Sequence, residues 1–183
     1  MKKSSFARVD LFELYVYIVH VDEWKLKKDK ILSLVNFNDK TASTKFGNLT
    51  YSDFGVESPS KEIYNKTFLS MVNPYLKEFH KHVYPYKQIW GPWCQKQLSG
   101  DFHQTHDHGS IGYSAVFYAK INPDVHESTS FISPFPHPND GSVKSRNLQA
   151  NEGDLIFFPA HLLHGSIPHK SDEDRIVFSF NLL

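Results

Sequence analysis

The sequence predicts a mainly β domain with flanking helices, in which a barrel-like half follows a helical half. After about residue 88, short runs rich in β-branched and aromatic side chains recur between Gly, Pro, Asn and Asp. Before that point, apolar residues recur at helical spacing. The chain has 183 residues, 40% of them hydrophobic, which is enough to bury one substantial core. We therefore expect one domain over residues 1–183, with helical support over about 1–87 and a barrel over about 88–183.

The helical half begins with a strand-like run at residues 14–21, and a first helix is expected over about residues 22–35. A second helix is expected to start at Ser58, because Pro59 follows it at the first helical position, and to run to about His82. Its apolar stripe consists of Ile63, Tyr64, Phe68, Met71, Val72, Tyr75 and Phe79. We expect both helices to lie against the outer face of the barrel, with this stripe as core packing rather than a cofactor contact.

The barrel half contains five strand-like runs. They lie at residues 88–91, 113–121, 130–132, 155–158 and 176–180. Each is short and bounded by turn residues, as strands of an all-β barrel are. Residues 134–150 form the longest loop-rich stretch, which is either a lid over a site or an ordinary surface loop.

Composition argues against nucleic-acid and membrane binding, against a disulfide and against secretion. Lys+Arg and Asp+Glu are balanced at 20 each, so no overall field favours nucleic acid or an anionic membrane. The single cysteine, Cys94, cannot form an intrachain disulfide. The apolar run at residues 14–21 is too short to span a membrane, and its acidic flanks do not suit a signal peptide. These features predict a cytoplasmic protein.

A cluster of metal-binding side chains lies at residues 102–109, which hold three imidazoles and one carboxylate. In an extended strand, side chains at i and i+2 share a face, so His106 and His108 can bind one ion while Asp107 points away. A His-x-His triplet alone is weak evidence, because short motifs recur by chance.

A third ligand is expected from a neighbouring strand. Residues 153–159 read as a turn that feeds a short buried strand, and His164 follows it. Two ligands close together and one distant along the chain leave coordination positions open, as catalytic metal sites require. His106, His108 and His164 are therefore candidate ligands of a mononuclear metal centre.

The order of these motifs resembles the 2-oxoglutarate and Fe(II)-dependent oxygenases, and more narrowly their small stand-alone bacterial and phage members. The resemblance rests on residues 100–108, 112–118, 153–165 and 175–181 and covers roughly residues 88–183. It implies a double-stranded β-helix, that is, a cupin-like jelly-roll barrel, with Fe(II) as cofactor and 2-oxoglutarate as co-substrate. No motif in residues 1–87 matches the family.

The chain departs from the family's usual ligand set, which is two histidines and one carboxylate. His108 falls where the carboxylate normally lies, so the resemblance implies His106, His108 and His164 as ligands. Three imidazoles suit Fe(II). The rival is Asp107, which replaces His108 if a β-bulge reverses the alternation, with His103 or His106 as its partner. Otherwise His103 is expected to be structural.

The resemblance also implies a co-substrate site. Arg175 occupies the position that binds the distal carboxylate of 2-oxoglutarate in the family, and Tyr118 matches a tyrosine that assists it. Arginine suits this role, because its planar fork binds a carboxylate through two hydrogen bonds. A hydroxyl often lies two residues after the arginine, whereas this chain has Val177 there. Ser179 or Asn181 can compensate.

The resemblance implies an Fe(II)- and 2-oxoglutarate-dependent dioxygenase that would hydroxylate an unknown substrate with dioxygen and release succinate and carbon dioxide. One alternative is a cupin-like metal enzyme that does not use 2-oxoglutarate, in which Arg175 would form a surface ion pair with the acids at residues 172–174. Another is a non-catalytic metal-binding or interaction protein. A dry wall beside the site could come from Trp90, Trp93, Phe117 and Phe131, although core packing is the simpler role for each.

Overall fold

The computed structural model describes residues 14–38 and 47–183, which form two helices and eleven strands. In chain order these are β1 (Tyr17–His20), α1 (Trp24–Ser33), β2 (Gly47–Asn48), β3 (Tyr51–Ser52), α2 (Pro59–His82), β4 (Ile89–Gln97), β5 (Phe102–His106), β6 (Tyr113–Lys120), β7 (Ser130–Ile132), β8 (Ser145–Asn147), β9 (Asp154–Pro159), β10 (His164–Ser166) and β11 (Arg175–Leu182). Neither helix is long and apolar enough to cross a lipid bilayer within these ranges.

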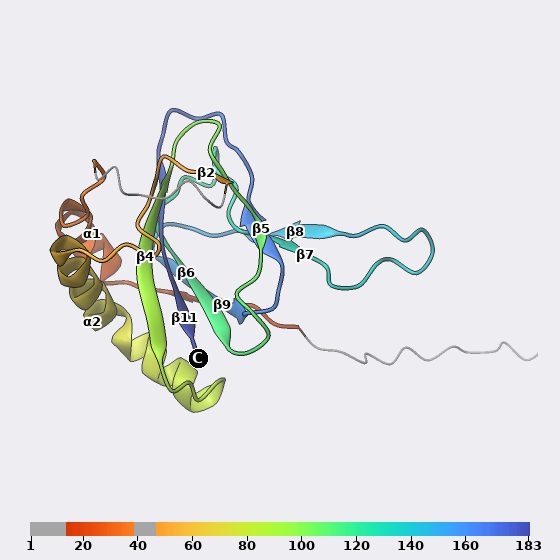
Figure 1. The fold of residues 1–183 in the computed structure, drawn as a ribbon, viewed down its shortest axis with the longest axis horizontal. Helices are drawn as coiled ribbons and strands as arrows, with labels where there is room; N and C mark the ends of the chain where they lie inside the picture. Colours follow the sequence, from red (N-terminus) through yellow and green to blue (C-terminus); the bar gives the residue numbers. More distant parts are fainter. Residues whose placement is uncertain (1–13, 39–46) are drawn as a thin grey trace, which may run out of the picture.

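The strands form two antiparallel sheets that face each other as a jelly roll (Figure 1). One sheet has six strands in the order β1-β9-β6-β11-β4-β3, and the other has five in the order β2-β5-β10-β7-β8. The predicted mainly β class and jelly-roll barrel are confirmed. Three strands from the first 87 residues join these sheets at their edges, so the N-terminal half supplies β1, β2 and β3 as well as helices.

Both helices lie on the outer face of the six-stranded sheet, as predicted (Figure 1). The side chain of Ser58 caps α2 by accepting a hydrogen bond from the backbone N–H of Lys61. Phe68 is fully buried and stacks on Phe178 of β11 with ring centroids 4.8 Å apart. The stripe of α2 is therefore core packing, except that Ile63 is 54% exposed and does not belong to the core.

The loop-rich stretch at residues 134–150 contains a strand that the sequence did not predict. β8 pairs with β7 through Ser130↔Asn147, Phe131↔Arg146 and Ile132↔Ser145. The connection between the two strands projects away from the barrel (Figure 1). Its outer part is a protruding hairpin and not a segment folded over the barrel.

Candidate metal centre

The strands β5 and β10 bring the distant histidines together. They pair antiparallel with His164 directly opposite His106, so residues 58 positions apart share one rung of the sheet. Gly165 permits this close approach, because a Cβ at that position would lie 2.8 Å from the backbone oxygen of His103. A larger residue would push β10 away from β5 and separate the two imidazoles.

The register of this pair shifts, which places a third imidazole at the site. His164 pairs with His106, but Ser166 pairs with His103, so two residues of β10 span three residues of β5. This bulge lets His103 and His106 face the same side despite their i, i+3 spacing, with ring centroids 4.2 Å apart. β5 ends at His106, and the backbone N–H of His108 donates to Ala160 instead of to a sheet neighbour.

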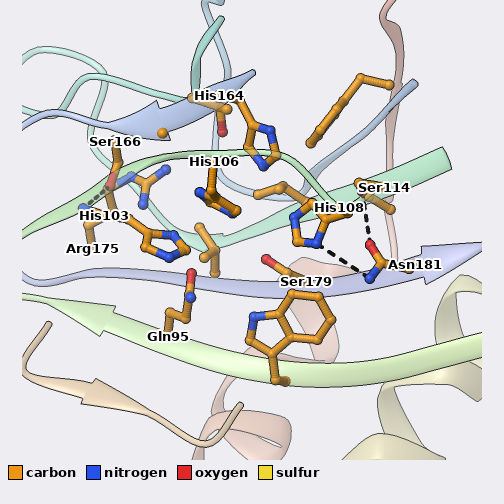
Figure 2. Close-up of a pocket in the computed structure, with 17 residues that line it drawn as sticks. Gln95, His103, His106, His108, Ser114, His164, Ser166, Arg175, Ser179 and Asn181 are labelled. Carbon is orange, nitrogen blue, oxygen red and sulfur yellow. Dashed lines mark hydrogen bonds between the residues drawn. The ribbon is translucent and has the colours of Figure 1, made fainter. Parts of the chain in front are cut away.

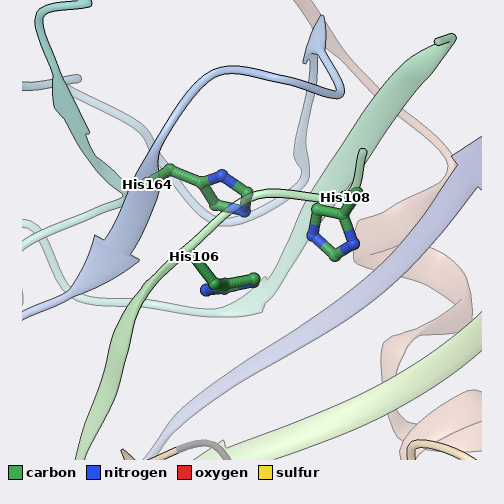
Figure 3. Close-up of side chains that lie close together, drawn as sticks. All are labelled: His106, His108 and His164. Atoms are coloured by element: carbon green, nitrogen blue, oxygen red, sulfur yellow. The ribbon is translucent and has the colours of Figure 1, made fainter. Parts of the chain in front are cut away.

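Three imidazoles converge in the barrel (Figure 3). One ring nitrogen from each of His106, His108 and His164 lies within 4.8 Å of the others. The Nδ1 of His106 is 2.8 Å from the backbone oxygen of Gln104, and the Nδ1 of His164 is 2.8 Å from that of Leu162. A carbonyl can only accept, so both rings carry their proton on Nδ1. Their Nε2 lone pairs are therefore available to a metal ion.

The third ring is oriented by a side chain. The Nδ1 of His108 lies 3.4 Å from the amide of Asn181, which also contacts Ser114 (Figure 2). The other ring nitrogen of His108 is turned toward His106 and His164 (Figure 3). Binding a metal through that nitrogen requires a proton on Nδ1, and Asn181 must then present its oxygen to His108 and its nitrogen to Ser114.

Burial keeps these imidazoles neutral. It lowers the pKa of His164 to about 3 and the pKa of His108 to about 4, and it also lowers the pKa of His106. Burial likewise lowers the pKa of His103 to about 3. Neutral imidazole is the form that binds a metal, so the site is ready for a cation at neutral pH. The donor set therefore fits a mononuclear Fe(II) ion.

Asp107, the rival ligand, does not lie with the three converging imidazoles. It is exposed, and its Oδ1 accepts a hydrogen bond from the backbone N–H of Gly109. The bulge that could have reversed the alternation occurs before His106 and not after it. The geometry thus favours the set His106, His108 and His164, whose role as ligands stays a prediction.

Arg175 lies in the same pocket as the histidines, at the end opposite Asn181 (Figure 2), which we call the inner end because Arg175 is buried there. It is 5% exposed, and its Nη1 donates to the Oε1 of Gln97 at 2.6 Å. The Nε2 of Gln97 donates to Ser166 at 2.6 Å, so both ends of this amide are hydrogen-bonded within the protein. Arg175 is buried and does not form the surface ion pair of the alternative interpretation with residues 172–174; Asp174 binds Lys96 and Lys120 instead.

One donor of Arg175 is left over. Its Nε is buried and has no hydrogen-bond partner among the described residues. A buried N–H without an acceptor costs about 1–3 kcal/mol, which a bound carboxylate would remove. Burial lowers the pKa of Arg175, but an arginine remains charged. The pocket therefore has a cationic inner end suited to an anionic ligand.

Tyr118 lies beside Arg175 and carries the guanidinium over its ring, 5.6 Å from the centroid. Its hydroxyl donates to the Oγ1 of Thr129 at 2.8 Å and accepts from the backbone N–H of Thr129 at 3.1 Å. Thr129 lines the pocket, as do Ser179 and Asn181. A direct contact between Tyr118 and a co-substrate stays a prediction and would require this hydroxyl to turn.

Sequence reasoning missed several polar residues of the pocket. Gln95, Gln97 and Ser166 all line it or hold Arg175. The available signal was polar alternation inside an otherwise apolar strand, since Gln95 and Gln97 are two residues apart in β4. Of the four expected wall residues, Trp93 lines the pocket, whereas Phe117 and Phe131 belong to the two core clusters.

Three converging imidazoles and a buried arginine in one pocket of a jelly roll are typical of mononuclear metal enzymes of the cupin and oxygenase type. Residues 91–181 match the family profile described as "Putative 2OG-Fe(II) oxygenase", and this range contains all five predicted site residues. The protein belongs to the 2-oxoglutarate and Fe(II)-dependent oxygenase family. No curated protein matches the chain in sequence.

Solved structures share the fold at low sequence identity. A prolyl-4-hydroxylase from Pseudomonas putida has a TM-score of 0.62 and 10% identity, covering 91% of this chain and 91% of that one. The epimerase SnoN from nogalamycin biosynthesis has a TM-score of 0.60 and 12% identity, covering 92% and 77%. HygX from Streptomyces hygroscopicus, with nickel and 2-oxoglutarate bound, has a TM-score of 0.59 and 12% identity, covering 91% and 81%.

Proposed function

We propose that this protein is an Fe(II)- and 2-oxoglutarate-dependent dioxygenase that hydroxylates its substrate and releases succinate and carbon dioxide. The observation that carries the proposal is one continuous pocket with three neutral imidazoles at one end and the buried guanidinium of Arg175 at the other. This is the arrangement that a dianionic keto acid needs when it bridges a metal ion and a cation.

In this proposal His106, His108 and His164 hold the iron, and the bound iron supplies the redox chemistry that activates dioxygen. Three imidazoles bring no negative charge, so the ion keeps its full charge toward the co-substrate. Arg175 binds the distal carboxylate of 2-oxoglutarate, supported by Gln97 on one side and the ring of Tyr118 on another. The protein's own task is to orient both ligands and to exclude water.

The relatives differ in what they do with such a site. They include a prolyl-4-hydroxylase and an epimerase, so the family alone does not select hydroxylation. We place the activity in the cytoplasm, a reducing compartment that suits both Fe(II) and the unpaired, buried Cys94.

The test begins with metal stoichiometry. Protein loaded anaerobically with Fe(II) is expected to hold about one iron per chain, and a His164→Ala variant is expected to hold far less. His161→Ala is the matched control, because this exposed histidine lies three residues earlier, in the turn between β9 and β10. Loaded wild-type protein should then convert 2-oxoglutarate to succinate in air. Iron uptake without succinate from any candidate substrate would contradict the oxygenase proposal, and absence of iron uptake would contradict the metal site.

A further inference from the structure

A second cavity opens beside the metal centre, between the two sheets. This side cavity of about 220 Å³ lies between Trp93 and Gln95 on β4 and the histidines of β5, with Phe54 at one edge. It shares His106 and His108 with the candidate metal centre, but Arg175 does not line it. The side cavity is therefore next to the metal and separate from the cationic inner end.

Gln95 is the polar group of this cavity that the protein does not use. It is 8% exposed, and its side-chain amide makes no hydrogen bond with any residue in the described ranges. Its neighbour Gln97, two residues further along β4, uses both ends of its amide on Arg175 and Ser166. Gln95 instead points from β4 toward His103 across the pocket (Figure 2). The amide atoms of Gln95 are open to the cavity, where a ligand with a matching donor and acceptor would replace the water that solvates them.

Among the described residues, no lysine or arginine lines the side cavity, so only the neighbouring metal ion would attract an anion there. Asp107, which also lines it, accepts a hydrogen bond from the backbone N–H of Gly109. The Gln95 amide is neutral and offers both a donor and an acceptor. Its best complement is another carboxamide, which can exchange one hydrogen bond in each direction.

Size and apolar surface define the rest of the ligand. At about 220 Å³ the side cavity is smaller than the roughly 300–1,000 Å³ of a site for a whole drug-sized molecule. The aromatic side of the cavity continues outward, because Trp90 is 39% exposed and packs against Phe54 and Trp93. The space therefore fits one apolar group the size of a side chain, with the remainder of a larger molecule outside.

We propose that the side cavity binds the primary substrate through an uncharged, apolar group of side-chain size that bears a carboxamide, and that Gln95 pairs with this carboxamide. The inference rests on the proposed function, because it takes the neighbouring histidines to hold the metal. The same chemistry occurs in a free carboxamide and in a peptide.

The test uses protein loaded with Mn(II) and 2-oxoglutarate, and reads the paramagnetic relaxation of probe protons by NMR. Three probes share one ring: cyclopentanecarboxamide, cyclopentanecarboxylate and cyclopentylmethylammonium. The carboxamide is expected to bind, and Mn(II) is expected to increase the relaxation rate of its protons. The two ions are expected to bind at least tenfold more weakly. N-acetylleucine N-methylamide distinguishes a peptide substrate from a free carboxamide. If this peptide analogue binds, the substrate is a peptide. If cyclopentanecarboxamide binds and the peptide analogue does not, the substrate is a free carboxamide.

Gln95→Leu is expected to weaken carboxamide binding about tenfold, while substitution of an exposed glutamine that lines neither cavity, Gln149→Leu, leaves it unchanged. Since Gln95→Leu removes an unpaired amide, its Tm should equal or exceed that of the wild type. Gln95→Met provides a second apolar variant. Binding of either ion as tight as the carboxamide, or full carboxamide binding by the Gln95 variants, would overturn the inference.

Titration of 2-oxoglutarate into the same samples separates the two proposals. If 2-oxoglutarate does not bind the wild type, the proposed function fails. If it binds and no carboxamide does, only the inference about the side cavity fails. If the Gln95 variants lose affinity for 2-oxoglutarate and keep it for the carboxamide, Gln95 belongs to the co-substrate site and the inference is overturned.

Discussion

Replacement of Arg175 by methionine should abolish tight binding of 2-oxoglutarate and leave metal binding intact. Gln97 accepts a hydrogen bond from the Nη1 of Arg175, while the buried Nε has no partner. A carboxylate would therefore gain two charge-assisted hydrogen bonds, from Nε and from Nη2 on the same edge of the guanidinium. Loss of one partner of such a buried pair costs about 2–5 kcal/mol. At about 1.4 kcal/mol per tenfold, the affinity should fall roughly 30- to 3,000-fold. Arg175→Lys keeps the positive charge but loses the planar fork of the guanidinium, so its affinity for 2-oxoglutarate is expected to lie between those of the wild type and Arg175→Met.

The assay is isothermal titration of 2-oxoglutarate into protein loaded with Mn(II). Arg146→Met is the matched control, because Arg146 lies on the exposed strand β8 and lines neither the pocket nor the side cavity. Removal of Arg175 also leaves the Oε1 of Gln97 without its donor, so the Tm should fall. Mn(II) stoichiometry is measured in parallel to show that the site is intact. Unchanged affinity for 2-oxoglutarate in Arg175→Met would refute the reasoning.

Three further predictions follow from the structure. Asn181→Leu should lower metal affinity about 10- to 100-fold, whereas Asn181→Asp should retain it, because a carboxylate can still accept from Nδ1 of His108; equal affinities in a metal titration would contradict this. Burial lowers the pKa of His126, so the free energy of unfolding falls as the pH drops below about 6.5, where the unfolded chain binds the proton more readily than the folded one. Between pH 7.5 and 5.5, urea unfolding of His126→Gln should show a smaller loss of this free energy than the wild type, and identical losses would refute the assignment. Phe68→Ala should cost about 3–5 kcal/mol, against about 0.5 kcal/mol or less for the exposed Ile63→Ala, and similar costs would contradict the packing of α2.

The fold was largely predictable because helices and strands leave short-range patterns of apolar and turn residues in the sequence. The serine cap and apolar stripe of α2 predict the helix and the face that it buries, and turn residues delimit the main strands of the barrel. β8 was missed because Ser145–Asn147 is fully exposed and carries no apolar alternation. Its strand conformation comes from backbone pairing with β7, which is a tertiary contact.

The candidate site was predictable as a set of residue types and not as a network. The spacing of His106 and His108 and the strand before His164 are readable, but the bulge that also turns His103 inward is not, because it depends on how β5 pairs with β10. The hydrogen bond between Gln97 and Arg175 likewise depends on the register of β4 against β11. Cross-strand register is set by the whole sheet, so no window of sequence contains it.

The measurement that tests the central claim most directly is a crystal structure of the protein loaded anaerobically with Fe(II) and 2-oxoglutarate, with anomalous scattering recorded at the iron edge. One anomalous peak per chain is predicted, with nitrogen ligands from His106, His108 and His164 at about 2.0–2.2 Å. A carboxylate of 2-oxoglutarate should contact Arg175. A peak bound to Asp107 in place of His108, or one far from His164, would contradict the account.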